Sequence, residues 1–296
     1  MVDTQLLSSL ATTPAEHTID PEILGPILSN PPFISLPGSM NVRDIGAYSP
    51  GYVKPGIIFR SGTLDYLPES SRPLLRSQLG LRKIFDFRRR DEVKKPLCEV
   101  DGIQILSFPF KDGQVEDVPL DLADFVSQHG ELSSKGFREM YDLILEGYTT
   151  GYREVFEALK TVHDGNAVLF HCAGGKDRTG VMSALILDLM GAPASVIAEE
   201  YALTRIGVEP LRETMLPVVV LELSGVVQAD HEDAAAAVQR GLQVPGVRGV
   251  LSSDAGVMVD FVERLKENHG GAEGYLTNKL GFVEADIMQI RDNLRP

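Results

Sequence analysis

The segment HCAGGKDRTG, residues 171–180, lies between two apolar runs, NAVLF at 166–170 and VMSALILDLMG at 181–191. The first run has the length of a buried strand, and the second is apolar on nearly all sides, as a buried helix is. A loop that leaves a buried strand and enters a helix directs its backbone N–H groups toward one point, where the helix N-terminus adds partial positive charge. The segment therefore predicts a strand–loop–helix unit with an anion at its centre.

The side chains of this loop favour phosphate chemistry. Gly174 and Gly175 have no Cβ, so the backbone can curl closely around an anion. The planar fork of Arg178 matches two oxygens of a phosphate. Cys172 heads the loop, where the same field favours the thiolate form. A thiolate beneath a bound phosphate is placed to attack phosphorus.

Composition sets broad limits on function. The chain has 296 residues, 43% hydrophobic and 24% charged, as a soluble globular protein has. A formal net charge of −14 argues against nucleic acid or an anionic membrane surface as a partner. A local cationic pocket can still take a small anionic substrate. The six histidines show no ligand spacing, so we predict neither a metal site nor a cofactor.

Two observations favour a cytoplasmic protein. Cys98 and Cys172 are the two cysteines, too few for a disulfide framework. The first 20 residues lack the basic and apolar regions of a signal peptide, and no apolar run approaches the roughly 20 residues of a membrane span. We therefore expect no integral membrane association.

Hydrophobic patterns predict an α/β fold with a central mixed or parallel sheet flanked by helices. Residues 1–35 are expected to form a proline-interrupted N-terminal arm, and 36–296 a single domain. Within this domain, the Ala/Gly/Val-rich segment 217–253 is interpreted as a lid or a helical insertion. The predicted strands lie in NVRDIGAYSPGYVKPGIIFRSG (two strands), LRKIFDFR, GIQILSFPF and NAVLFH. One short helix is predicted to end at Gly80, one or two lie within 114–150, and another is capped by Ser195. Further helices are predicted at 151–162, at 179–190, from Met258 to a stop at Gly270, and at 283–294.

The loop resembles the phosphate loop of the protein tyrosine phosphatase superfamily, which reads His-Cys, five residues, Arg, then Ser or Thr. The matching residues are His171, Cys172, Arg178 and Thr179. The Lys-Asp pair before the arginine is similar to the AGKDRTG-type loop of the atypical tyrosine/lipid phosphatases of bacteria and fungi. Other pieces resemble the same branch, namely NVRDIGAY, GIIFRSG, FDFRRRDEV, EYALTR and YLTNKLGF. The alanine-rich 217–253 segment departs from it and leaves the shape above the site open.

The resemblance implies a cysteine-dependent phosphatase fold and metal-free hydrolysis of phosphate monoesters through a phosphocysteine intermediate. Phosphotyrosine, phosphoserine/threonine and phosphoinositides all occur as substrates in this branch. Cys172 would be the nucleophile and Arg178 would hold the phosphate. The remaining phosphate-binding residues are predicted to be Ala173, Gly174, Gly175, Lys176 and Thr179.

Two residues of the loop keep alternative roles. The Thr179 hydroxyl either donates to the cysteine sulfur or caps the following helix, and both roles are compatible. His171 is expected to order the loop by hydrogen bonding.

The proton donor for the leaving oxygen has several candidates. The resemblance implicates Asp177, with Lys176 contacting the phosphate. Alternatively, Asp177 orients Lys176 or Arg178. Asp86, Asp112 and Asp117 are reserve candidates.

The other charged residues receive structural interpretations. The basic run at 88–90, with Lys94 and Lys95, is expected to be a solvated face, the alternative being a second anion site for a polyphosphorylated substrate. Arg43, Asp44 and Arg60 are expected to form buried salt bridges. Cys98 is interpreted as a small buried hydrophobe or a reversible disulfide partner of Cys172.

Three functions fit these patterns. An active cysteine-dependent phosphatase comes first. A catalytically silent phosphate-binding module is disfavoured, because silent relatives usually lose the cysteine or the arginine and both are present here. A phosphatase of a small organic phosphate would use identical loop chemistry, so the sequence leaves that alternative open.

Overall fold

The computed structural model describes residues 4–93, 95, 100–110, 121–229 and 232–296. The predictions for Lys94, Cys98, Asp112 and Asp117 lie outside these residues.

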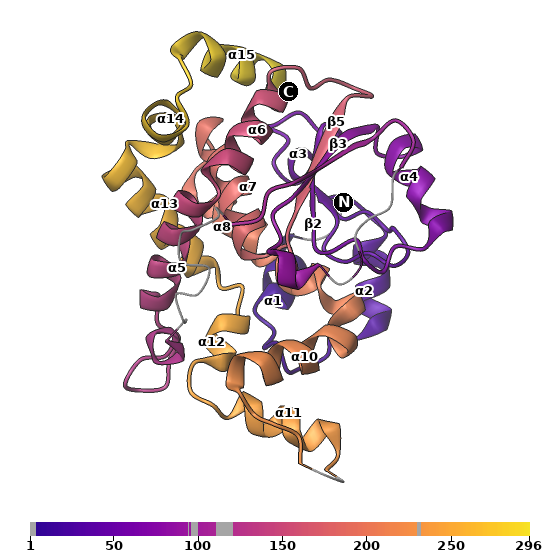
Figure 1. The fold of residues 1–296 in the computed structure, drawn as a ribbon, viewed down its shortest axis with the longest axis vertical. Helices are drawn as coiled ribbons and strands as arrows, with labels where there is room; N and C mark the ends of the chain where they lie inside the picture. Colours follow the sequence, from indigo (N-terminus) through magenta and orange to yellow (C-terminus); the bar gives the residue numbers. More distant parts are fainter. Residues whose placement is uncertain (1–3, 94, 96–99, 111–120, 230–231) are drawn as a thin grey trace.

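The described residues form a five-stranded sheet in the order β1-β2-β5-β3-β4 (Figure 1). β1 pairs antiparallel with β2, and the other neighbours are parallel, which confirms the predicted mixed sheet. β5 is central and buried throughout, as its uninterrupted apolar sequence predicts. The strands are β1 (Arg43–Asp44), β2 (Ile58–Ser61), β3 (Leu81–Asp86), β4 (Gln104–Ser107) and β5 (Ala167–His171).

The two faces of the sheet carry separate cores, because successive strand residues point to opposite sides. Val168 and Phe170 of β5 belong to the larger core, under α5–α8 and α13–α15. Leu169 points to the smaller core beside α4 (Arg72–Ser77). The helices of the larger face are α5 (Lys135–Gly147), α6 (Thr149–Leu159), α7 (Asp177–Leu189), α8 (Ala194–Ala202), α13 (Ala255–His269), α14 (Gly271–Tyr275), the π-helical turn η5 (Leu276–Leu280) and α15 (Glu284–Leu294).

The N-terminal arm contains two helices, α1 (Thr4–Ala11) and α2 (Pro21–Leu28). Their apolar residues pack with Leu203 and Ile206 beside α9 (Thr204–Gly207). The Arg205 guanidinium donates to three carbonyls of the segment that joins α1 to α2. The arm is thus docked on the helices that follow α7.

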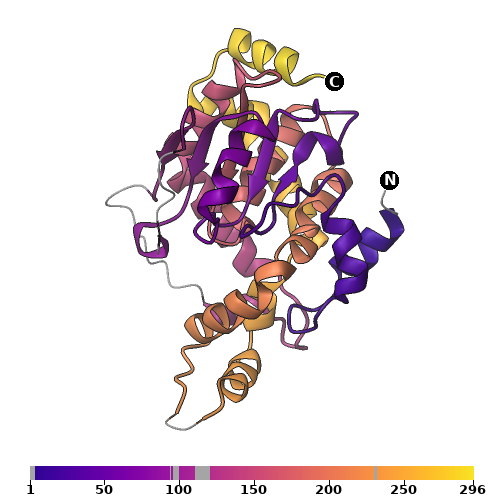
Figure 2. The same cartoon turned by 90° about the vertical axis from the view of Figure 1, so that its right-hand side faces the viewer.

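The segment predicted as a lid or helical insertion is helical. It contains the end of α10 (Arg212–Ser224), α11 (Ala234–Leu242) and α12 (Val247–Leu251), which Figure 2 shows projecting below the sheet. The three helices share a small core formed by Val220, Val238, Leu242 and Val247. α12 also packs against the 3₁₀ turn η3 (Leu122–Phe125).

Most helix ends fall where the sequence predicts them. α13 ends at Gly270, whose φ of +76° is the left-handed conformation that glycine favours. α8 differs, since Pro193 occupies its N-cap position and Ser195 lies inside the helix. A four-residue helix, α3 (Ile45–Tyr48), follows β1, and short 3₁₀ turns occur at η1 (Glu69–Ser71), η2 (Arg90–Glu92) and η4 (Glu209–Leu211). No helix in the described part of the chain is both long and apolar enough to cross a membrane.

Candidate active site

The segment 171–179, called the cysteine loop here, leaves the carboxyl end of β5 and enters α7 at Asp177. Its position at the carboxyl ends of three parallel strands is where open α/β sheets bind ligands.

Three successive carbonyl groups of the cysteine loop are bonded to groups outside it. These bonds fix the peptide planes, and a peptide directs its N–H opposite to its carbonyl. The N–H groups of the same planes therefore face away from the anchoring residues. The anchoring bonds run from the Thr63 N–H to Ala173 O (2.8 Å), from Asn41 Nδ2 to Gly174 O (3.1 Å) and Gly175 O (3.0 Å), and from Arg60 Nη2 to Gly175 O (2.7 Å).

A buried ion cluster holds two of these anchors, namely Arg60 directly and Asn41 through its bond with Arg43. Glu200 in α8 accepts from Arg43 Nε at 2.7 Å and from Arg60 Nη1 at 2.5 Å, and all three side chains are buried. Burial raises the pKa of Glu200, but the charges of the two arginines outweigh this effect and hold it below its ordinary value. The predicted buried salt bridges are confirmed for Arg43 and Arg60. Asp44 instead accepts the backbone N–H groups of Gly46 and Gly56.

Cys172 is free and only 2% exposed, at the base of the loop. The Thr179 hydroxyl donates to its sulfur at 3.2 Å. Thr179 lies in the first turn of α7, whose N-cap position is occupied by Lys176. The structure therefore brings Thr179 to the sulfur, and the alternative role as the helix cap is wrong.

The two loop glycines have different surroundings. Gly175 has a φ of +67°, and a Cβ there would lie 2.4 Å from the Ser61 carbonyl oxygen. Only glycine fits this position without a shift of the backbone. A Cβ on Gly174 would meet nothing within 4 Å, so the protein itself does not require glycine there.

Arg178 is held by two acceptors that occupy one end of its guanidinium. Glu92 accepts from Nη1 at 2.5 Å and from Nη2 at 2.7 Å, and the Phe87 carbonyl accepts from Nη1 at 3.0 Å. A guanidinium has five N–H groups, so these bonds leave the Nε–H and one Nη2–H, which share its side edge. The Tyr148 hydroxyl lies close enough to the guanidinium to hydrogen-bond with it. The side edge of Arg178 carries the N–H groups that can bind an anion.

The opposite charges of Arg178 and its neighbours favour the ionised form of each group. Burial lowers the pKa of Arg178, but the negative charge on Cys172 and the bonded Glu92 raise it well above its ordinary value. Burial raises the pKa of Glu92, and the bond from Arg178 reverses the effect and lowers it. The Tyr148 hydroxyl lies near all three groups, and burial raises its pKa. The guanidinium and Glu92 therefore stay ionised over the neutral range.

Asp177 and Lys176 form a network on the other side of the loop. Asp177 Oδ1 accepts from the Tyr141 hydroxyl and from Lys176 Nζ, each at 3.0 Å, and a quarter of the Asp177 side chain is exposed. The Tyr141 hydroxyl also lies 2.9 Å from that of Tyr201. Burial raises the pKa of Tyr141 and brings that of Tyr201 to about 12, so both phenols keep their protons near neutral pH.

The Lys176 amine is bonded to carbonyl groups at the end of the helical insertion. It donates at 2.9 Å to the carbonyls of Val250 and Ser252, at the end of α12, and lies 5.0 Å from the centre of the Phe137 ring. The amine is therefore held by protein groups, and the contact with phosphate that the resemblance implies stays a prediction. The amine joins the cysteine loop to the helical insertion.

Comparison with known proteins agrees with this geometry. Residues 34–296 match the family described as the tyrosine phosphatase family. The chain belongs to this family.

Two relatives extend over most of this phosphatase. It is 27% identical to the triple specificity protein phosphatase PtpB of Mycobacterium tuberculosis, over 86% of this chain and 96% of the relative. It is 33% identical to a tyrosine-protein phosphatase of Nostoc commune, over 79% of this chain and 73% of the relative. The protein is a cysteine-dependent phosphatase that acts on phosphate monoesters.

The loop histidine of the phosphatase is buried beside a carboxylate. His171 Nδ1 lies 3.3 Å from the Cys172 carbonyl oxygen, and Nε2 lies 3.8 Å from Asp86 Oδ2. Burial lowers the pKa of His171. A neutral imidazole between two backbone-fixed groups orders the loop, as the sequence predicts.

Asp86 is less suited to the role of reserve acid. Arg88 donates to both of its carboxylate oxygens, from Nε at 3.0 Å and from Nη2 at 2.8 Å. Burial raises the pKa of Asp86, but His171 and Arg88 together bring it below its ordinary value. A carboxylate held in the ionised form is a poor proton donor at neutral pH.

The basic run that begins at Arg88 is only partly solvated. Arg88 is buried and also pairs with Asp65 at 2.6 Å, so the prediction of a solvated face is wrong for this residue. Arg89 is exposed and pairs with Asp91 at 3.2 Å. Across the described residues, no group of three His, Cys, Asp or Glu side chains could hold a metal ion.

Proposed function

We propose that Cys172 is the nucleophile of this phosphatase. Its thiolate forms an S–P bond as the P–O bond to the leaving group breaks, and water then cleaves the phosphocysteine. The observation that carries the proposal is the outward anchoring of the loop carbonyls, which leaves N–H groups to bind the phosphate oxygens above the sulfur. The Thr179 hydroxyl, 3.2 Å from the sulfur, stabilises the thiolate as attacking and as leaving group.

In this proposal Arg178 binds two phosphate oxygens through the Nε–H and Nη2–H of its side edge. Glu92 and the Phe87 carbonyl position the guanidinium from the other edges. The backbone N–H groups of Ala173, Gly174, Gly175 and Lys176 bind the same oxygens. These donors are fixed before the substrate arrives, so little reorganisation accompanies the transition state.

We propose that Asp177 protonates the leaving oxygen and later takes a proton from the attacking water. Its Oδ1 is fixed by Tyr141 and Lys176, which leaves Oδ2 to carry the proton. When Asp177 gives up its proton, the adjacent ammonium of Lys176 stabilises the carboxylate that remains. The orienting role that Asp177 could have toward Lys176 is thus part of the same mechanism.

We propose phosphotyrosyl proteins as the first substrate class to test, with phosphoserine/threonine and phosphoinositides next. The names of the relatives support this order, and a nucleophilic cysteine that is only 2% exposed favours a long aryl phosphate over a short alkyl one. We further propose a cytoplasmic protein that does not bind nucleic acid, as the net charge of −14 favours. Residues 36–296 would form the phosphatase domain, and 1–35 an arm that docks on it.

The deciding experiment compares Cys172→Ser with the wild-type enzyme on p-nitrophenyl phosphate, phosphotyrosyl peptide, phosphoseryl peptide and phosphoinositide. The serine variant should lose turnover on every substrate and still bind phosphotyrosyl peptide, since a hydroxyl without an adjacent base is a poor nucleophile. Appreciable turnover by the variant contradicts the mechanism. A wild-type preference for phosphoseryl peptide contradicts the substrate proposal alone.

A further inference from the structure

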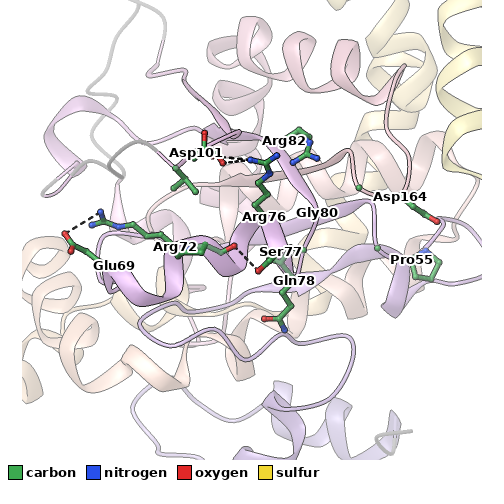
Figure 3. Close-up of a pocket in the computed structure, with 15 residues that line it drawn as sticks. Pro55, Glu69, Arg72, Arg76, Ser77, Gln78, Gly80, Arg82, Asp101 and Asp164 are labelled. Atoms are coloured by element: carbon green, nitrogen blue, oxygen red, sulfur yellow. Dashed lines mark hydrogen bonds and ion pairs between the residues drawn. The ribbon is translucent and has the colours of Figure 1, made fainter.

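A second cavity lies at the opposite edge of the sheet from the cysteine loop. It has a volume of about 1050 Å³ and is lined by α4 and by residues that precede β2, β3, β4 and β5 (Figure 3). Because these four strands are parallel, their starts meet at the edge away from Cys172. Gly165 of the cavity precedes Cys172 by seven residues of mostly strand structure, or roughly 20 Å at about 3.3 Å per residue. One small ligand cannot reach both places.

Three arginines line this cavity, Arg72 and Arg76 from α4 and Arg82 from β3. Figure 3 shows Arg76 and Arg82 extending to the same side of the cavity. Among the described residues, Arg82 Nη1 and Arg72 Nε are buried and have no hydrogen-bond partner. These two nitrogens are covered by protein, as are Arg60 Nε and Ser61 Oγ, which also have no partner, so a ligand would meet the accessible parts of the guanidinium groups.

β3 is irregular beside Arg82. Leu81 pairs with Ala167 and Lys83 pairs with Val168, so Arg82 is one extra residue relative to β5. Such a bulge re-aims a side chain, and bulges concentrate near functional sites. Ile84 packs in the smaller core beside α4, so Arg82, two residues earlier, lies on the same face of the sheet.

Acidic side chains of the cavity lie at its solvent edge. Glu69 is 3.8 Å from Arg72 and Asp101 is 3.5 Å from Arg76, and both carboxylates are exposed. Ion pairs of this kind are weak because water screens them. Arg72, in contrast, is only 16% exposed. The inner part of the cavity is therefore more cationic than its rim.

We propose that this cavity binds a phosphorylated small molecule with at least two anionic groups. Guanidinium groups that line one cavity from two elements, α4 and β3, match an anion that offers several oxygens. The volume exceeds that of one phosphate and lies at the size of small-ligand pockets. The site is separate from the proposed catalytic residues, so it can be tested independently of the proposed function.

Calorimetric titration with pyrophosphate tests this site. The background variant is Arg178→Ala, which removes the phosphate clamp of the cysteine loop and leaves the second cavity intact. It should bind pyrophosphate at one site, and Arg82→Gln or Arg76→Gln added to it should weaken this binding at least tenfold. Arg295→Gln, which removes an exposed arginine paired with Asp292, is the matched control and should leave the affinity unchanged.

Three outcomes overturn the proposal. One is that Arg178→Ala binds no pyrophosphate, and another is that the Arg76 and Arg82 variants bind it as tightly as the Arg295 control. The third is inorganic phosphate binding as tightly as pyrophosphate, which contradicts a ligand with two anionic groups. If Arg82→Gln does not fold, Arg76→Gln decides, because Arg76 is 43% exposed and its loss leaves the core intact. Circular dichroism and turnover of p-nitrophenyl phosphate by the Arg76 and Arg82 single variants show that the fold is retained.

Discussion

The substitution Gly175→Ala tests whether the close contact between the cysteine loop and β2 is required for the site. An added Cβ would lie 2.4 Å from the Ser61 carbonyl oxygen and 2.6 Å from the Gly62 nitrogen, and both are backbone atoms. Neither can rotate away as a flexible side chain would. The loop or the end of β2 must therefore move by about 1 Å to restore ordinary contact.

Two effects lower the free energy of unfolding of this variant. A non-glycine residue at a φ of +67° costs about 1–2 kcal/mol. The displaced backbone strains the anchors on the Gly175 carbonyl, so we expect the free energy of unfolding to fall by at least about 2 kcal/mol. A displacement of about 1 Å in the phosphate-binding groups should also reduce kcat about a hundredfold.

Gly174→Ala is the matched control, because a methyl there meets nothing within 4 Å and the φ of this residue is not left-handed. Its free energy of unfolding should stay within about 1 kcal/mol of the wild-type value. Urea unfolding of both variants, followed by circular dichroism, gives the comparison. Equal stabilities of the two variants would refute the reasoning from the Gly175 contact.

The remaining predictions concern charged groups around the loop. Asp177→Asn should lower kcat on an alkyl phosphate at least about a hundredfold, barely affect p-nitrophenyl phosphate, and flatten the basic limb of the pH profile; equal losses on both substrates would leave Asp177 only an orienting role. Glu200→Gln should lower the free energy of unfolding by roughly 3–5 kcal/mol at pH 7, because two buried arginines lose their counter-ion. Since the pKa of Glu200 is lowered in the folded state, urea unfolding at several pH values should show this difference shrinking as the pH falls below about 4, the ordinary range of a glutamate. Glu92→Gln should reduce kcat about tenfold in steady-state assays, because Arg178 loses its charged orienting partner, and Arg178→Lys should reduce it at least about a hundredfold; a Glu92→Gln enzyme as fast as the wild type would contradict the positioning role.

Local sequence patterns predict most of the elements and the composition of the loop. β5 and α7 follow from runs of apolar residues, and the loop between them needs no distant information. The seven residues from Cys172 to Arg178 are consecutive, so the sequence brings them together without any knowledge of the fold. The same holds for Cys172 and Thr179, which lie at the two ends of the cysteine loop and contact each other.

The partners of the loop could not be predicted in the same way. Asn41, Thr63 and Glu92 contact it only because β2 and β3 flank β5, and no periodicity in the sequence reveals that order. Three of the pieces that carried the family resemblance, NVRDIGAY, FDFRRRDEV and EYALTR, contain Asn41, Glu92 and Glu200 respectively. The sequence identifies these residues as parts of family motifs, but only the three-dimensional structure shows what each of them contacts.

The error at Arg88 arises because the environment of a charged side chain depends on distant residues. Arg88 follows a strand in a basic run, yet Asp65 and Asp86 surround it in a buried site. The Lys176 amine is likewise positioned by distant groups, the carbonyls of residues 74 and 76 positions later in the chain.

The anchoring of the loop also constrains the order of folding. Asn41 and Arg60 bond to loop carbonyls that lie 133, 134 and 115 residues further along the chain. Such contacts require closure of long chain segments and form slowly, whereas helices form from local contacts. During refolding from urea, the helical signal should therefore recover before turnover does.

A peptide that carries only β5 and α7 would contain every residue of the motif and none of these anchors. Its cysteine would lie in a chain with no fixed N–H groups around it and would react like an ordinary thiol. The catalytic unit of this phosphatase is thus the whole sheet, and its activity can serve as a late reporter of complete folding.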